Sequence, residues 1–390
     1  MDSIFSASEP SLGYLYQVRY GLMLIISQAN EDARLLLEKI DDISIDTLNS
    51  LQVYQTKLHI TSVANLTNAS TDLWKTLRVW SEGIKSGMLN PSTDLFNLIT
   101  TATASTDTIP YKLRQNTQKD RDVDGIFTGL KDVAASSVST TNKPAYDSFL
   151  SLSEDQQKSL IKNITVIDAS IDINEAKVLI LHEIRHYSLK KDSLYERLEG
   201  WFIGQAILHL QGLRDFITAK EVSTKILDIA DGFKSDNLPN DFNMSITADE
   251  AQLGPYRNKL FVKQIELIGS GQKVINNAIS DYHRSFSQKS KWLREGLIYP
   301  DDEITYDRQL KEDWERKFSI IADSVNTDDD ELQKTKGKTF FETHYITQYP
   351  QIHIKERFKE QYMVTGSCHM LADKKEVGWH PNFDNKLTTT

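Results

Sequence analysis

Apolar side chains recur with helical and strand periods through the first half of the 390-residue chain. Residues 11–30 are apolar along one side at helical spacing, which predicts an amphipathic helix with Ser11 as its N-cap. Residues 38–46 and 51–60 alternate β-branched or apolar residues with polar ones, the pattern of two short strands. Asp46–Ser50 between them has the composition of a turn, so we expect the two strands to pair.

The alternation of helix and strand continues beyond this pair. The further elements predicted are a helix at 70–85, a strand at 94–104, a helix at 153–163 capped by Ser153, a strand at 164–171 and helices through 174–230. Residues 231–243 carry the Gly, Pro, Asn and Asp of a linker, and the pattern after them is mainly helical. We therefore expect an α/β domain at 1–230, a linker at 231–243, and a mainly helical domain at 244–390 that regulates or docks partners.

Composition limits the class of protein. A hydrophobic content of 39% and a charged content of 26% are typical of a soluble globular protein. The net charge of −10 argues against a general nucleic-acid binder, although a locally basic groove or an oligomer can still hold a duplex. Cys368 is the single cysteine, which excludes internal disulfides and cysteine-cluster zinc sites. The sequence contains neither a signal peptide nor a membrane-spanning apolar run, so we expect a cytoplasmic protein without a membrane partner.

Candidate chemistry lies on the predicted strand pair. Gln55 and Lys57 are two apart and share one strand face, and Asp42 of the neighbouring strand is expected beside them. Asp42 and the Gln55 carbonyl are hard oxygen ligands suited to Mg²⁺, for which Mn²⁺ can substitute. Lys57 can orient the attacking water or stabilise charge on phosphoryl oxygens. Asp41 and Glu38 are second candidates, because only one of the adjacent residues Asp41 and Asp42 should face the metal.

Each of these patterns has a structural alternative. An exposed strand face with Gln and Lys is ordinary, and Gln17 in the first helix reads alone as a surface glutamine. His182-Glu183-Ile-Arg-His186 matches the zinc-protease motif literally, but no third ligand follows, so we interpret it as a chance match on an amphipathic helix.

Taken together, the motifs resemble a family of nucleases. Asp…Gln-x-Lys is similar to the restriction-endonuclease motif Asp…Glu-x-Lys with Gln in place of Glu. The set Gly13-Tyr-x-Tyr-Gln17, Asp41-Asp-Ile43, Gln55-x-Lys57 and Leu73-Trp-Lys-Thr-Leu77 resembles the double-stranded DNA endonuclease effectors of bacterial anti-phage defence, in CBASS and in Lamassu-type ABC three-component systems. This resemblance covers roughly the first 220 residues. It implies a restriction-endonuclease-like (PD-(D/E)xK) α/β sandwich in which Gln17 takes the place of an acidic residue that faces the metal.

A second resemblance lies near the C-terminus. Gly378-Trp-His-Pro381 is similar to the C-terminal signature of ABC three-component proteins, whose partners include an SMC-like ATPase. Trp379 and Phe383 are large side chains of the kind that anchor interfaces, and they either dock a partner or pack on their own domain.

The sequence thus predicts a Mg²⁺-dependent endonuclease that cuts double-stranded DNA. The resemblance implies an effector that works with an SMC-like ABC ATPase and a third small subunit, and that is inactive until it is released or forms a homo-oligomer. The alternative is a catalytically inactive adaptor in which the strand pair is a relic and the helical half recruits partners.

Overall fold

The computed structural model describes residues 8–47, 50–59, 64–244, 253–325 and 329–387. The chain divides into two compact units, 1–229 and 230–390. Two residues of the predicted turn, Leu48 and Asn49, and the last residue of the predicted second strand, Ile60, lie outside the described ranges.

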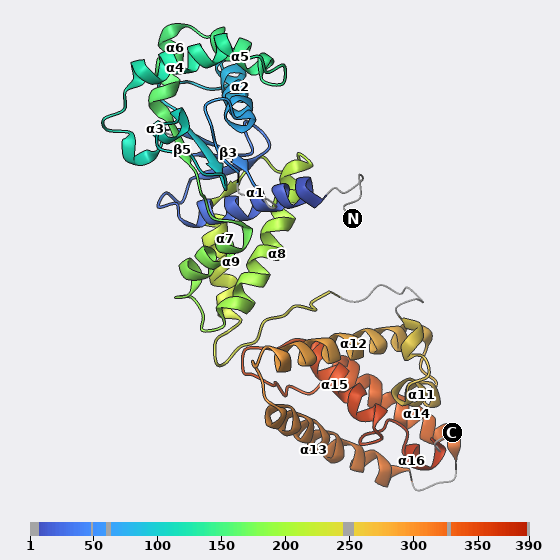
Figure 1. Cartoon of the computed structure of the whole chain (residues 1–390). Coiled ribbons are helices and arrows are strands. Elements are labelled where there is room, and N and C mark those ends of the chain that lie inside the picture. The colour runs from blue at the N-terminus through green and yellow to red at the C-terminus, as the bar shows by residue number, and fades with distance from the viewer. Residues whose placement is uncertain (1–7, 48–49, 60–63, 245–252, 326–328, 388–390) are drawn as a thin grey trace. The chain divides into compact units, whose positions relative to one another are not determined.

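The first unit is a mixed α/β structure around one sheet (Figure 1). Its elements are α1 (Ser8–Ile26), β1 (Arg34–Leu37), β2 (Ile43–Asp46), β3 (Leu51–Lys57), α2 (Thr71–Lys85), β4 (Leu95–Thr100), α3 (Ile109–Lys112), η1 (Gln115–Thr117), α4 (Val123–Ser136), α5 (Lys143–Leu150), α6 (Glu154–Asn163), β5 (Ile164–Ile167), α7 (Ile173–Ile184), α8 (Lys191–Leu210), β6 (Ile217–Thr218) and α9 (Ala219–Asp231). The helix predicted at 70–85 and the Ser153 cap are confirmed, the latter as a capping box with Gln156.

The strand order is β5-β4-β3-β2-β1-β6. The pairs β3–β4 and β4–β5 are parallel, whereas β6, β1, β2 and β3 pair antiparallel in succession. The antiparallel pairing of residues 43–46 with 51–54 confirms the expected strand pair, but the first predicted strand is wrong at its start. Residues 38–42 form the connection between β1 and β2, and β1 itself was not predicted.

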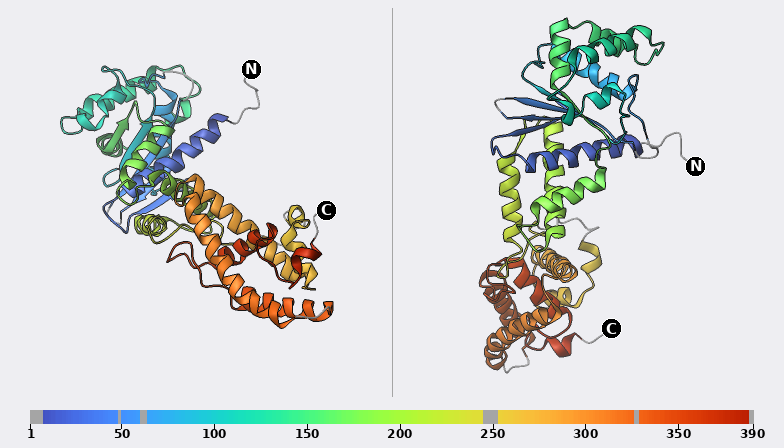
Figure 2. Two further views of the ribbon diagram at one scale, coloured as in Figure 1. Left: turned by 90° about the horizontal axis from the view of Figure 1, so that it is seen from below. Right: turned by 60° about the vertical axis from the view of Figure 1, so that its left-hand side comes forward.

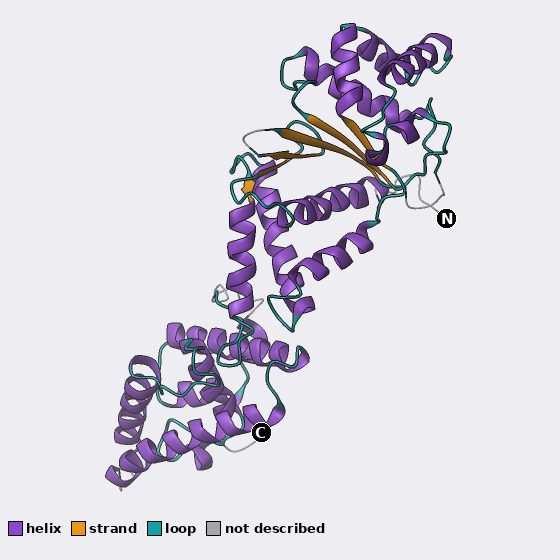
Figure 3. Cartoon of the chain, turned by 90° about the vertical axis from the view of Figure 1, so that its left-hand side faces the viewer, coloured by secondary structure: helices purple, strands orange, loops and turns teal. Residues whose placement is uncertain are grey.

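Helices cover the two faces of this sheet (Figures 2 and 3). On one face, α2, α4, α5 and α6 bury a core that includes Val53, Trp74, Trp80 and Phe96. On the other face, α1 contacts β1, β2 and β3 and is itself backed by α7 and α8. A Cβ on Gly21 of α1 would lie 3.4 Å from the Leu37 side chain, which shows how closely α1 lies on β1. The architecture is an α/β sandwich.

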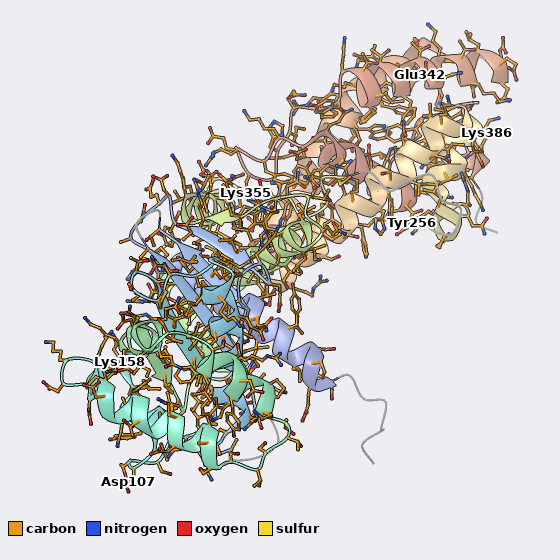
Figure 4. The ribbon with its side chains drawn as sticks, turned by 90° about the horizontal axis from the view of Figure 1, so that it is seen from above. Asp107, Lys158, Tyr256, Glu342, Lys355 and Lys386 are labelled. Atoms are coloured by element: carbon orange, nitrogen blue, oxygen red, sulfur yellow. The ribbon has the colours of Figure 1, made fainter. Side chains whose placement is uncertain are left out.

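The second unit is helical. It contains η2 (Gly254–Tyr256), α11 (Leu260–Leu267), α12 (Gln272–Arg294), α13 (Pro300–Ser324), α14 (Asp330–Phe341), the π-helical turn η3 (Glu342–Thr347), α15 (Gln361–Asp373) and α16 (Phe383–Lys386). Gly366 of α15 permits a very close crossing with α12, since a Cβ there would lie 2.1 Å from the Asp281 carbonyl oxygen. Lys386, labelled in Figure 4, is ion-paired with Asp330 and so ties α16 to the start of α14.

Candidate active site

The connection between β1 and β2 lies beside the end of β3. The strand register pairs Ile43 with Tyr54, which brings the preceding residues of the connection next to Gln55, Thr56 and Lys57. Glu38 begins the connection in the left-handed region, with φ 53°, and its N–H donates to the Asp42 carbonyl at 3.1 Å. A positive φ is uncommon for a residue with a side chain, so contacts with the surrounding structure must hold the Glu38 backbone in this conformation. The connection therefore presents its acidic residues at one end of the sheet.

Asp42 is bound to the middle residue of Gln-x-Lys. Its Oδ2 accepts hydrogen bonds from the Thr56 N–H at 2.8 Å and from the Thr56 Oγ1 at 3.0 Å. No described residue donates a hydrogen bond to its Oδ1. Asp42 is thus held by the residue between Gln55 and Lys57, and its Oδ1 has no donor among the described residues.

Asp41 has a different environment. Its side chain is buried, its Oδ2 accepts from the Trp80 Nε1–H at 2.6 Å, and its Oδ1 accepts from the Asp42 N–H at 3.0 Å. Burial, followed by the negative charge of Asp42, raises the pKa of Asp41 to about 7, although the hydrogen bonds and the charge of Lys57 lower it. Both oxygens already have donors, so Asp41 is arranged to hold the Asp42 backbone and not to face a ligand.

Glu38 connects the carboxylates to the first helix. Burial and, after it, the charge of Asp42 raise the pKa of Glu38, whereas the charge of Lys57 and a hydrogen bond with Gln17 lower it. Gln17 is half-buried, and its Oε1 is buried without a hydrogen-bond partner in the described part of the chain. Gln17 therefore belongs to this cluster, and the surface-glutamine alternative does not describe it.

Gln55 and Lys57 lack hydrogen-bond and ion-pair partners among the residues that the structure describes. The side chain of Gln55 is 6% exposed, and no hydrogen bond joins its amide to a described residue. Lys57 is half-buried and forms no ion pair within the described ranges. Gln55 is not among the residues with fully buried, unpartnered side-chain atoms, so its amide and the Lys57 ammonium group are both accessible to a ligand.

The donor set fits a hard divalent cation. Asp42 and Gln55 offer oxygen atoms, and Mg²⁺ typically takes only one or two carboxylates and completes its shell with water and substrate phosphate. A pocket of about 210 Å³ is lined by residues 38–42 of the connection and by Val79, so it gives access to Asp42, whereas Gln55 and Lys57 do not line it. Among the described residues, no three His, Cys, Asp or Glu side chains converge as a ready-made metal cage.

The zinc-protease pattern does not form a site. The helix α7 ends at Ile184, so His186 lies beyond it and the two histidines do not share a helical face. His182 and Glu183 are more than half exposed. The interpretation as a chance match agrees with this geometry.

Trp379 and Phe383 are core residues, which favours the second of the two alternatives, packing on their own domain. Trp379 is fully buried against Phe341 and Tyr345, with ring centroids 5.0 and 4.6 Å away. Phe383 is 6% exposed and packs on Trp314, whose indole N–H donates to the Gly378 carbonyl at 2.8 Å. The motif therefore folds back on its own unit.

Two contributors to the site were missed from the sequence. Thr56 occupies the variable position of Gln-x-Lys, and Trp80 was interpreted only as a core residue of the second helix. A partial signal was available for Trp80, since a buried indole N–H needs an acceptor, but the acceptor lies 39 residues away in the sequence.

The helical unit matches a known protein family. Residues 261–387 match the family model of C-terminal domain 7 of the ABC-three component (ABC-3C) systems. The match supports a component of an ABC-3C defence system. It covers the segment in which Gly378-Trp-His-Pro lies and leaves the α/β unit unassigned.

Other comparisons are distant. No curated protein matches the chain. The Acinetobacter baumannii Cap4 SAVED/CARF-domain containing receptor with 2′3′3′-cAAA is 14% identical, with a TM-score of 0.37 over 73% of this chain and 59% of that one. The Moraxella osloensis Cap4 SAVED/CARF-domain containing receptor is also 14% identical, with a TM-score of 0.35 over 71% and 68%. The chain thus spans about 59% of the first of these structures, and likeness at this level carries no functional information. Within the described residues, no helix is long and apolar enough to cross a membrane.

Proposed function

We propose that the chain is a Mg²⁺-dependent endonuclease of double-stranded DNA and the effector of an ABC-3C defence complex. The observation that carries the proposal is the acidic connection at the end of β3, where Asp42 binds Thr56 between Gln55 and Lys57 and keeps an oxygen without a donor among the described residues. The α/β sandwich around these residues supports the restriction-endonuclease-like interpretation, and the ABC-3C match supports the defence context.

Each residue has a distinct part in the proposed hydrolysis. Asp42 and Gln55 would hold Mg²⁺, which when bound polarises the scissile phosphate and lowers the pKa of water. Lys57 would donate to the phosphoryl oxygens as water attacks phosphorus and the bond to the leaving sugar oxygen breaks. Glu38, whose pKa is raised, lies near Lys57 and would take up the proton released by the attacking water. Asp41 and Trp80 would keep Asp42 in place.

The net charge of the chain and the replacement of the usual Glu by Gln55 both suggest that the nuclease is regulated. A neutral amide in place of a second carboxylate weakens the hold on a free cation. The net charge of −10 also disfavours DNA binding by the isolated chain. We propose that an SMC-like ATPase and a third small subunit hold the nuclease inactive, and that release or homo-oligomerisation assembles the DNA-binding groove.

Plasmid cleavage by the full chain tests this function. The wild type, at concentrations that allow self-assembly, should nick or linearise DNA with Mg²⁺ or Mn²⁺ and stop with EDTA. Lys57→Ala should abolish cutting, whereas Lys75→Ala, which removes an exposed lysine from α2, should retain it. Equal cutting by Lys57→Ala and the wild type would show that another site or a contaminant is responsible.

One observation favours an adaptor as the second candidate. The acidic residues do not converge as a metal cage in the described part of the chain, and Gln replaces the usual Glu. An adaptor would bind its partner subunits normally after Lys57→Ala and would show no metal-dependent cleavage in the assembled complex.

A further inference from the structure

A second cavity lies in the helical unit, in a segment for which the sequence predicted no chemistry. It has a volume of about 150 Å³ and is lined by α12, by α15 and by the junction of α14 with η3. Asn277, Ile346 and Gln361 are exposed at its mouth, whereas Thr365 and His369 are buried. A cavity of this size accommodates a ligand about as large as benzene.

The polar side chains in this cavity come from two helices. Asp281 of α12 accepts a hydrogen bond from the Thr365 hydroxyl of α15, with 2.6 Å between Oδ2 and Oγ1. His369, one turn further along α15, is 4% exposed, and its Nδ1 has no hydrogen-bond partner among the described residues. Burial lowers the pKa of His369 to about 3, so the imidazole is neutral near pH 7.

The charge of the lining is negative. Asp281 is the only acidic residue that lines the cavity, and no Lys or Arg lines it. Burial raises the pKa of Asp281, whereas the hydrogen bond from Thr365 and the charge of Arg284 lower it. Arg284 forms an ion pair with Asp281, with 3.7 Å between its Nη1 and the Asp281 Oδ1. Its remaining N–H groups donate to the carbonyls of Phe242 and Asn243 at 2.7 Å, so it neutralises Asp281 only in part. A phosphate or carboxylate ligand would meet repulsion here, whereas a cation would be attracted.

The apolar part of the lining suits the same ligand. Phe341 and Tyr345 contribute aromatic rings, and Val274, Ala278 and Ile346 complete the wall. Aromatic rings beside a carboxylate are the usual environment for organic cations in proteins. Tyr345 and Ile346 lie in the π-helical turn η3, which begins at Glu342 (Figure 4), and such turns are rare and often found at functional sites.

We propose that this cavity binds an alkylammonium group, with Asp281 as its counter-ion and the alkyl chain against Phe341 and Tyr345. The group belongs either to a free small amine or to a lysine side chain of another protein. The site is independent of the proposed nuclease, because every residue that forms it lies in the helical unit.

Ligand-observed NMR and calorimetry on the full chain test the proposal with defined probes. The probes are n-butylamine, the neutral isostere 1-butanol, and Nα-acetyl-lysine N-methylamide. n-Butylamine should bind with a Kd on the order of 1 mM, as expected for a ligand of about five heavy atoms, and 1-butanol at least about tenfold more weakly. The lysine derivative separates the two sources. If it binds as tightly as n-butylamine or more tightly, the natural ligand is a lysine side chain of another protein. If it does not bind, the natural ligand is a free amine.

Three variants connect binding to the cavity. Asp281→Asn keeps the acceptor for Thr365 and removes the charge, and it should weaken n-butylamine binding at least about tenfold. Ile346→Trp, at an exposed position of the mouth, should block entry without altering the core. Asp323→Asn removes an exposed carboxylate from α13 and should leave binding unchanged. Equal binding of n-butylamine and 1-butanol, or n-butylamine binding that survives Asp281→Asn, would overturn the proposal.

Discussion

The substitution Trp80→Phe tests the coupling between α2 and the acidic connection. It removes the indole N–H that donates to the Asp41 Oδ2 at 2.6 Å and keeps an aromatic ring in the core. The rise of the Asp41 pKa from 3.8 to about 7 corresponds to about 4 kcal/mol against the charged form in the folded state. Loss of a donor to that charge should cost a further ~2 kcal/mol and raise the pKa again by about one to two.

The sign of the pH dependence follows from the direction of the shift. The folded state holds the Asp41 proton more tightly than the unfolded chain. The stability that protonation contributes is therefore fully present below about pH 4 and is lost as the pH rises through about 7. Near pH 5, Trp80→Phe should lower the free energy of unfolding by about 2 kcal/mol, because the ring is smaller and a hydrogen bond to a neutral carboxyl is lost. Near pH 9 the lost hydrogen bond is to a charged carboxylate, so the loss should be about 4 kcal/mol.

Urea unfolding at the two pH values measures this difference, with Trp74→Phe as the matched control. Trp74 is fully buried on the same helix, and its indole N–H donates to the uncharged Asn68 carbonyl at 2.8 Å. Its replacement should cost a similar amount at both pH values. If Trp80→Phe were equally independent of pH, the raised pKa of Asp41 and its dependence on Trp80 would both be refuted.

Two further substitutions address the metal ligand and the C-terminal motif. Gln55→Glu adds a carboxylate beside Asp42 and should tighten Mg²⁺ binding about tenfold in calorimetry, and unchanged affinity would remove Gln55 from the metal site. Trp379→Ala should destabilise the helical unit by about 3–5 kcal/mol in urea unfolding, because it empties a fully buried site. A loss of less than about 1 kcal/mol would show that Trp379 is not a core residue.

Sequence patterns predicted the elements that have strong periodicity. The helix α2 and the strand β4 have clear apolar spacing, and both formed, although β4 ends at Thr100 and not at the predicted Ala104. The strand β1 was missed because Leu35, Leu36 and Leu37 form an apolar run without alternation directly after a helix. The strand exists because α1 covers it on one face and because β2 and β6 pair with it on either side, which are long-range contacts.

The candidate site also combines features that the sequence predicts with features that depend on long-range contacts. The spacing of Gln55 and Lys57 and the proximity of Asp42 follow from strand geometry. The different environments of Asp41 and Asp42 do not follow from it, because they depend on a turn with positive φ at Glu38 and on a tryptophan from α2. The two alternatives for Trp379 stay open in the sequence for a related reason, since burial of this segment depends on the helices that it meets.

The measurement that tests the central claim most directly is Mn²⁺ binding to the full chain by electron paramagnetic resonance. A nuclease held inactive is silent in a cleavage assay, but its metal ligands are still present. The account predicts Mn²⁺ bound to the wild type, lost in Asp42→Asn and retained in Asp32→Asn, which removes an exposed carboxylate from the same unit. Absence of bound Mn²⁺, or binding that survives Asp42→Asn, would contradict a metal-dependent active site at the end of β3.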